Sequence, residues 1–250
     1  LSYFPGQYHS RLLANIDILD QNILISTFEQ TRPELVINCI GLIKQRHEAN
    51  DPLLALPINA TLPHRLDSLC LHFGARLVHF STDCVFSGKK GMYCESDLSD
   101  ATDVYGKSKL AGEITESPTT ITLRISAIGH ELNSSIGLID WFLSQSNAVK
   151  GYRKAVFSGM PTAEIARIVE KYVMPRPELQ GLYHVSVEPI DKMSLLQLVA
   201  KEYGKNIEII PDLKVSLDRS LDSSRFRKVT GYKPPSWINL IRLMRKSQQY

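Results

Sequence analysis

Short apolar runs alternate with amphipathic segments along the first half of the chain. The runs are rich in β-branched residues, as is typical of strands covered on both faces, and predict strands at 34–41, 75–82 and 120–126. The amphipathic segments predict helices at 21–31, 58–74 and 104–114. Asp20 is a suitable cap for the first helix, and Gly74 ends the second. This order predicts an α/β fold with a parallel sheet, helices on both faces and right-handed crossovers.

The second half of the chain is less regular. Helices are expected at 137–145, 161–173, 195–204 and 234–246, and strands at 181–186 and 206–211. Ser194 can cap the third of these helices. In the last helix, Trp237, Ile241 and Met244 have helical spacing, which indicates that they belong to the core.

Composition narrows the class of protein. The 250 residues are 43% hydrophobic and 22% charged, which is ordinary for a globular protein with a sizeable core. The net charge is +3 and the basic residues are scattered, so neither a nucleic-acid nor a membrane surface is indicated, although a small anionic ligand would suit this charge. No apolar run reaches the ~18 residues of a membrane span, and the first residues lack a signal-peptide pattern. Four cysteines without C-x-x-C spacing favour reduced thiols in a cytoplasmic protein.

The segment DVYGKSKLAGE, residues 103–113, places Tyr105 and Lys109 four residues apart on one helix face. A tyrosine hydroxyl can protonate the oxygen of a carbonyl that is being reduced, and a lysine ammonium one turn away lowers its high pKa. Thr82, at the end of a predicted strand, is a candidate to hold the carbonyl oxygen. A Y-x-x-x-K pair is expected roughly 0.6 times by chance in this composition. Taken alone, the pair is equally well explained as a solvated helix face.

Two longer motifs accompany the Tyr105–Lys109 pair and make its interpretation more specific. Residues 81–88 read STDCVFSG, and residues 105–113 read YGKSKLAGE after an acidic stretch. Together they closely resemble the extended short-chain dehydrogenase/reductases, and most of all the branch of dTDP-4-dehydrorhamnose reductases and related sugar-nucleotide-modifying proteins. Weaker similarity runs from about Asp17 to the C-terminus. The combined match is far more specific than the tyrosine–lysine pair.

The resemblance implies a fold and an activity. It implies a Rossmann-like sheet, with residues 1–128 and 151–187 in the cofactor domain and residues 129–150 and 188–250 in a smaller substrate-binding part. It also implies an oxidoreductase that uses NADP or NAD to reduce a 4-keto-6-deoxy sugar nucleotide for polysaccharide precursor synthesis. A homodimer is compatible with it, and no metal is expected. Two alternatives stay open: an epimerase of the same family, and a non-catalytic regulatory subunit with this fold.

The resemblance also implies roles for individual residues. Tyr105 would donate the proton, Lys109 would bind the nicotinamide ribose and lower the pKa of Tyr105, and Thr82 would hold the substrate carbonyl. The further cofactor-binding positions are Asp17 and Ile18 beside the adenine, Cys39, Ile40 and Gly41 in the turn under the cofactor, and Ser81. The further substrate-binding positions are Lys44, Asp83, Arg124, Ser126 and Ala127.

One departure from the family pattern concerns the phosphate-binding loop. Such proteins open with a G-x-x-G-x-x-G loop, but Gly6 is the only glycine before Gly41 here. Because loss of a central strand would expose apolar edges, we expect the native chain to carry this unit upstream of Leu1. The choice between NAD and NADP stays open, since the residues that select it would follow the missing strand.

A second departure concerns the sugar. Ala127 stands where dehydrorhamnose reductases carry an aromatic residue, so a UDP-linked amino sugar is an equally compatible substrate. His47 and His130 lie near the expected rim of the site and could touch a substrate. A lone histidine is more often structural, and that interpretation is favoured for both.

Overall fold

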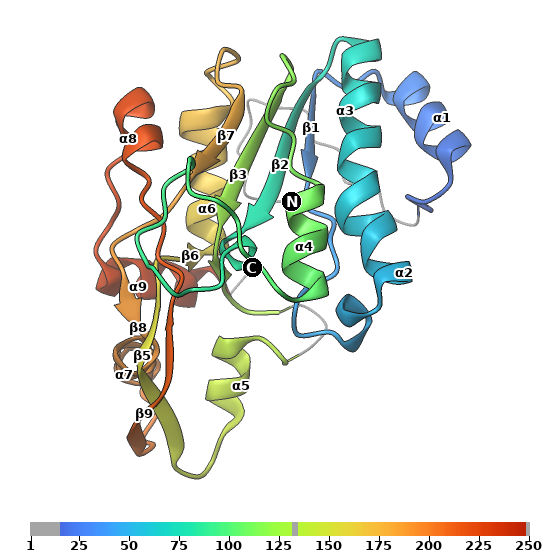
Figure 1. Cartoon of the computed structure of the whole chain (residues 1–250). Helices are drawn as coiled ribbons and strands as arrows, with labels where there is room; N and C mark the ends of the chain where they lie inside the picture. The colour runs from blue at the N-terminus through green and yellow to red at the C-terminus, as the bar shows by residue number, and fades with distance from the viewer. Residues whose placement is uncertain (1–15, 132–134, 249–250) are drawn as a thin grey trace.

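The computed structural model describes residues 16–131 and 135–248, and a four-stranded parallel sheet lies at its centre (Figure 1). Its strands, in spatial order, are β1 (Leu35–Asn38), β2 (Arg76–Thr82), β3 (Thr120–Ile125) and β7 (Gly181–His184). The register sets Asn38 beside His79 and Thr82 beside Ile125. The strands point downward in Figure 1, so their carboxyl ends meet at the lower edge of the sheet, where open α/β sheets bind ligands.

Helices cover both faces of this sheet, as the sequence pattern predicts. One face is covered by α1 (Gln21–Thr31), α3 (Leu62–Phe73) and α4 (Val104–Ala111). The other face is covered by α6 (Thr162–Ile168), its π-helical continuation Val169–Val173, and α9 (Trp237–Ser247). Within β2, Leu77 is buried in the core with α1 and α3, whereas Val78 is buried in the core with α6 and α9. Because both faces are covered, the strand reads as a continuous apolar run.

A smaller part lies below the main sheet in Figure 1. It contains a three-stranded sheet in the order β8-β5-β9, formed by β5 (Val149–Phe157), β8 (Ile190–Asp191) and β9 (Ile209–Asp218). It also contains the helices α5 (Leu138–Ser144) and α7 (Lys192–Tyr203). The short strands β4 (Ala127–Ile128) and β6 (Met160–Pro161) pair with each other. Ile128 is buried in the smaller core and Met160 in the main core, and Trp237 packs against both. These contacts join the two parts.

The division of the chain into two domains stays a proposal, but the structure places β5 in the smaller part. β5 pairs with β8 and β9, and its end residues Val149 and Phe157 are buried in the smaller core. A boundary at residue 151 would cut this strand, so the geometry favours a boundary after Phe157. The hydropathy pattern does not predict β5, because exposed charged residues such as Lys150 and Lys154 interrupt its apolar positions.

The helix expected at 58–74 is longer than the sequence suggests. It begins with α2 (Pro52–Ala55) and a π-helical turn (Leu56–Thr61), which run into α3. The side chain of Asp51 caps this start by accepting a hydrogen bond from the backbone N–H of Leu53 at 2.9 Å. A π-helical turn inside a helix is uncommon and often marks a functional position.

The expectation that Ser194 caps its helix is wrong. α7 begins at Lys192, and the carboxylate of Asp191 accepts a hydrogen bond from the Ser194 N–H at 2.9 Å. Asp191 is a stronger acceptor and already satisfies the first turn, so the helix starts three residues earlier than predicted.

The C-terminal region agrees with the sequence in outline. The strand expected at 206–211 is found, but it starts at Ile209 and runs to Asp218, and a helix that the sequence does not predict, α8 (Ser224–Thr230), follows it. In α9, Ile241 and Met244 are buried as expected. None of the helices in the described part of the chain is long and apolar enough to cross a membrane.

Candidate active site

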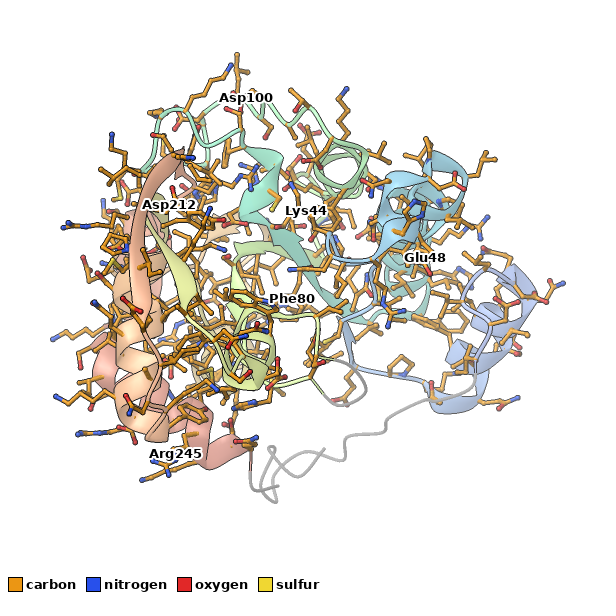
Figure 2. The ribbon with its side chains drawn as sticks, turned by 90° about the horizontal axis from the view of Figure 1, so that it is seen from below. Lys44, Glu48, Phe80, Asp100, Asp212 and Arg245 are labelled. Atoms are coloured by element: carbon orange, nitrogen blue, oxygen red, sulfur yellow. The ribbon has the colours of Figure 1, made fainter. Side chains whose placement is uncertain are left out.

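The helix α4 carries Tyr105 and Lys109, and its start is fixed by Asp103. One carboxylate oxygen of Asp103 accepts a hydrogen bond from the Gly106 N–H at 2.7 Å and caps the helix. The other oxygen pairs with the ammonium of Lys44 at 2.7 Å. Figure 2 views the molecule from below, toward the carboxyl ends of the strands, and Lys44 lies near the middle of that view. The cap therefore places Tyr105 in the first turn, at the rim of the sheet.

Two glycines let α4 approach its neighbours closely. A Cβ atom on Gly106 would lie 2.4 Å from the backbone oxygen of Cys84, and one on Gly112 would lie 2.0 Å from that of Asn59. Neither position tolerates a larger residue without movement of backbone. The first contact brings Tyr105 against the turn that ends β2, and the second holds the end of α4 against the π-helical turn.

Thr82 and Tyr105 meet at the end of β2. Thr82 is 8% exposed, and its hydroxyl accepts a hydrogen bond from the Cys84 N–H at 3.1 Å and donates one to Asp83 Oδ1 at 3.2 Å. Burial, and after it the neighbouring Cys84, raises the pKa of Tyr105 above its usual value, while a hydrogen bond with Thr82 opposes the shift. The phenol is therefore protonated at neutral pH, as a proton donor must be.

Lys109 is buried one helical turn further on. It is 6% exposed, and its Nζ donates a hydrogen bond to the backbone oxygen of Phe80 at 2.7 Å. Burial lowers the pKa of Lys109 to about 8, and the charge of Glu113 opposes this. Among the described residues, the ammonium has no second hydrogen-bond partner, so it can donate two further hydrogen bonds to a ligand. The groups that shift the pKa of Tyr105 do not include Lys109, so the tuning of Tyr105 by this lysine stays a prediction.

The turn after β1 lies beside Lys109. Cys39, Ile40 and Gly41 are exposed, and a Cβ atom on Gly41 would lie 4.0 Å from Lys109 Nζ. The structure thus brings this predicted cofactor turn and α4 together. An open turn with a glycine leaves room for a cofactor to approach the backbone.

Asn59 fixes that turn and was not identified from the sequence. It is fully buried in the π-helical turn, where Oδ1 accepts a hydrogen bond from the Leu42 N–H at 2.9 Å and Nδ2 donates one to Ser108 Oγ at 3.1 Å. It therefore connects the cofactor turn to α4. The available signal was an asparagine two residues after Pro57 inside a helical pattern, where a polar side chain needs a specific partner.

Asp17 and Ile18 precede α1 and lie against α3. The Leu19 carbonyl accepts a hydrogen bond from Arg65 at 3.1 Å, and Ile18 packs on the core formed by α1 and α3. Within the described ranges, no hydrogen bond connects Asp17 or Ile18 to Lys109. Their contact with an adenine stays a prediction.

Arg124 and Ser81 belong to a buried polar network. The Arg124 guanidinium binds both carboxylate oxygens of Glu113, at 2.8 and 2.7 Å, and each of these two side chains is 4% exposed. Ser81 donates to the same carboxylate at 2.6 Å, and Arg124 also contacts His184 at 3.2 Å. Glu113, His184 and Ser99 engage all three guanidinium nitrogens of Arg124, and the Ser81 hydroxyl is bound to Glu113, so the geometry favours a structural role for Arg124 and Ser81. Their predicted contacts with substrate and cofactor remain untested.

Asp83 and Ser126 lie beside Thr82. Asp83 is 6% exposed, and burial raises its pKa, while a hydrogen bond with Ser126 and the charge of Arg219 oppose this shift. Ala127 follows Ser126 directly and is exposed. The predicted substrate residues 83, 126 and 127 are thus together, at the junction with the smaller part.

Two cations from the smaller part approach the same turn and were missed in the sequence. Arg219 Nε donates a hydrogen bond to the Phe86 backbone oxygen at 2.8 Å, and its Nη1 lies 3.7 Å from Cys84 Sγ. Lys192 lies close enough for the charges of Asp83 and Cys84 to act on its pKa. Both are far from β2 in the sequence, and no local pattern distinguishes them from other surface cations.

The two candidate histidines have different surroundings. Both ring nitrogens of His130 contact protein, at 2.5 Å from Asp140 Oδ1 and 2.8 Å from the Tyr203 hydroxyl, which supports the structural interpretation. His47 begins a short 3-10 turn (His47–Asn50) and is exposed. The described residues contain no group of three or more His, Cys, Asp or Glu side chains that could hold a metal ion.

Comparison with known families identifies the chain. The family model described as RmlD substrate binding domain matches residues 6–246. The chain belongs to this family. The expected membership in the extended, dTDP-4-dehydrorhamnose reductase-like branch is thereby confirmed.

Relatives of this RmlD-family chain are named as reductases. It is 24% identical over 266 residues to the dTDP-4-dehydrorhamnose reductase of Aggregatibacter actinomycetemcomitans, covering 96% of this chain and 90% of that protein. It is 30% identical over 152 residues to a probable low-salt glycan biosynthesis reductase of Haloferax volcanii, covering 56% of this chain and 51% of that protein. A crystal structure of dTDP-4-dehydrorhamnose reductase from Bacillus anthracis in complex with NADP superposes with a TM-score of 0.80 at 19% identity, over 93% of this chain and 87% of that one. This likeness establishes the Rossmann-like fold.

Proposed function

We propose that this protein uses NADPH or NADH to reduce the keto group of a nucleotide-linked 4-keto-6-deoxy sugar. The observation that carries the proposal is the meeting of the buried Thr82 with the half-buried Tyr105 at the end of β2, with Lys109 one helical turn away. A protonated phenol and a hydroxyl at one point are what the oxygen of a reacting carbonyl requires. The related proteins named as dTDP-4-dehydrorhamnose reductase support the choice of substrate class.

The described residues fit the nicotinamide end of such a cofactor. The exposed turn at Gly41 gives access to the backbone, and Lys109 has unused donors beside that turn for the hydroxyls of a ribose. When bound there, the cofactor would supply the hydride. The relative from Bacillus anthracis was crystallised with NADP, which supports NADP as the first choice here and NAD as the second.

The protein's own part in the reaction is to place the sugar and deliver a proton. Tyr105 would donate its proton to the carbonyl oxygen as hydride arrives at carbon. The Thr82 hydroxyl, which donates a hydrogen bond to Asp83, would turn to the same oxygen and hold it. The positive charge of Lys109 would stabilise the phenolate that remains, and below pH of about 8 the ammonium keeps this charge.

The test is a turnover assay on the complete gene product. A panel of dTDP- and UDP-linked 4-keto-6-deoxy sugars is offered with NADPH or NADH, and loss of reduced cofactor is followed together with sugar product. We expect one reduced cofactor to be consumed for each sugar reduced. An altered sugar without net consumption would replace the proposal with an epimerase. No change in any sugar would favour a non-catalytic binding subunit.

The same proposal includes a cellular setting. A reductase of this class would serve the synthesis of a polysaccharide or glycan precursor, and the relative from Haloferax volcanii is named for glycan biosynthesis. All four cysteines are free thiols, which supports a cytoplasmic location. A homodimer is compatible with the family resemblance, and light scattering of the purified protein measures the assembly directly.

A further inference from the structure

His79 lies in the middle of β2 and is fully buried. Its side chain is on the same face of the sheet as that of Leu77, two residues earlier, so it lies toward α3 and α4 (Figure 1). Its Nδ1 is 3.1 Å from the Nδ2 atom of Asn38, its neighbour on β1. Burial, and after it the charge of Lys109, lowers the pKa of His79 well below its usual value. The ring is therefore neutral at neutral pH.

Asn38 connects His79 to the turn after β1. It is the last residue of β1 and is 3% exposed, and its Oδ1 accepts a hydrogen bond from the Ile40 N–H at 3.0 Å. The Leu42 N–H, two residues later, is also bound by a buried asparagine side chain, at 2.9 Å. Buried side chains therefore hold the turn on both sides of Gly41, whereas Gly41 itself is exposed.

These contacts determine which nitrogen of His79 carries the proton. The Ile40 N–H is a donor, so the Asn38 amide must turn its oxygen toward Ile40 and its NH2 group toward His79. Nδ1 of the neutral ring is then the acceptor, and the proton is on Nε2. In the part of the chain that the structure describes, this Nε2 is buried without a hydrogen-bond partner. An unpaired buried donor costs free energy that an apolar side chain would avoid, so stability alone does not explain a histidine here.

The hydrogen bonds of this pair lead to the turn. Within the described ranges, the recorded partner of the His79 ring is Asn38, and the Asn38 oxygen binds the Ile40 N–H. A turn that is ordered before its ligand arrives binds more tightly, since binding does not have to order it. We propose that His79 is a positioning residue for the cofactor: through Asn38 it holds the turn at Gly41 in the conformation that receives the nicotinamide end of NADPH or NADH. The identity of this ligand rests on the proposed function, which assigns the cofactor to that turn.

Binding of NADPH and of NADH to the complete gene product tests this role without any sugar. The fluorescence of the reduced nucleotide is followed as protein is added, and urea unfolding checks each variant. His79→Leu removes the acceptor for Asn38 and should weaken cofactor binding by about tenfold or more. Asn38→Ala removes the contact with the turn itself, should weaken binding at least as much, and repeats the test in case His79→Leu does not fold. The double variant should bind no more weakly than Asn38→Ala alone, because both changes act through one contact.

Two further variants separate positioning from stability. In His79→Asn, the side chain places an amide oxygen near the position of Nδ1, so cofactor binding should return to within about threefold of the native value. Thr122→Val is the matched control, because Thr122 is fully buried, lies beside His79 on β3 and donates a hydrogen bond to the Ile114 backbone oxygen at 2.8 Å. Its loss should lower the urea midpoint and leave the cofactor affinity unchanged.

The outcomes separate this role from the proposed function. Cofactor binding that is as tight in His79→Leu and Asn38→Ala as in the native protein overturns the positioning role, and so does an equal loss of affinity in Thr122→Val. A loss that His79→Asn does not restore also overturns it. In each of these cases, reduction of a keto sugar by the native protein leaves the reductase proposal standing. If the native protein binds neither NADPH nor NADH, both proposals fail. If the cofactor binds as expected but no keto sugar is reduced, His79 keeps its role and the reductase proposal fails.

Discussion

Two buried cations lie near the carboxyl ends of the strands, and their surroundings differ. Arg124 on β3 forms a two-point ion pair with Glu113, contacts His184, and lies 5.0 Å from the ring centre of Phe86. Lys109 on α4 is buried to nearly the same extent, but its recorded hydrogen bond goes to the neutral oxygen of Phe80. The acid whose charge acts on the pKa of Lys109 is also Glu113, and its oxygens are already bound by Arg124 and Ser81.

This difference separates a charge that holds the fold from a charge that can receive a ligand. Removing the partner of a fully paired buried cation is strongly destabilising, because it leaves an uncompensated charge in the interior. A buried cation with few partners destabilises the native state, and it is retained where a bound ligand completes its hydrogen bonds. Among the described residues, Lys192 and Arg219 also have few partners, although both are only half-buried. Lys109 lies beside the turn after β1, and Arg219 and Lys192 lie near the turn after β2.

The largest expected effect is on the reaction rate, and it comes from the part of the site that can receive a ligand. Tyr105→Phe removes the proton donor and should lower kcat by about 10²–10⁴-fold while leaving the unfolding midpoint nearly unchanged. Steady-state rates of sugar reduction measure it, and urea unfolding confirms the fold. Tyr172→Phe is the matched control, because Tyr172 packs against the core on the other face of the sheet. A Tyr105→Phe variant with a near-normal rate would remove this residue from the mechanism.

The next largest effect is on stability, and it comes from the buried ion pair between Arg124 and Glu113. Glu113→Gln keeps the shape of the side chain but leaves the buried Arg124 without its counter-charge, so the free energy of unfolding should fall by about 3–4 kcal/mol. Urea unfolding at neutral pH measures the loss. Glu116→Gln, at an exposed position three residues later, should change stability by less than about 0.5 kcal/mol. Equal stability of the two variants would show that the Arg124–Glu113 pair contributes nothing to the fold.

Periodicity and motif predicted much of this picture, because both are local signals. The parallel sheet with covered faces follows from apolar runs such as 75–82, and the meeting of Thr82 with Tyr105 follows from strand ends that share one edge. What the sequence could not reveal depends on segments that meet only in the fold. The family resemblance assigned Arg124 to the substrate, and no sequence pattern indicated its ion pair with Glu113, because Glu113 follows α4 and the pairing is not periodic.

The site residues that the sequence analysis missed also depend on segments that meet only in the fold. Asn59 is needed because a π-helical turn brings it to Leu42 and Ser108. Lys192 and Arg219 reach the site from the smaller part, more than a hundred residues after the turn that they border. Their chemistry is ordinary, and only their position relative to distant segments makes them candidates.

The smallest expected effect decides whether the comparison is correct. Loss of a structural cation should lower the free energy of unfolding, whereas loss of the Lys109 charge should raise it. Lys109→Met should raise the free energy of unfolding by about 1–2 kcal/mol at about pH 7, since it removes a charge whose pKa burial lowers to about 8. Between about pH 8 and about pH 10.4, the usual lysine value, the unfolded native chain binds a proton that the folded chain does not. The native chain therefore gains stability as pH rises through this window, and the advantage of the variant shrinks. Urea unfolding at both ends of the window measures this, with exposed Lys107→Met as the control on the same helix. A Lys109→Met variant that is less stable than the native chain at neutral pH would mean that this ammonium is structural, as Arg124 is.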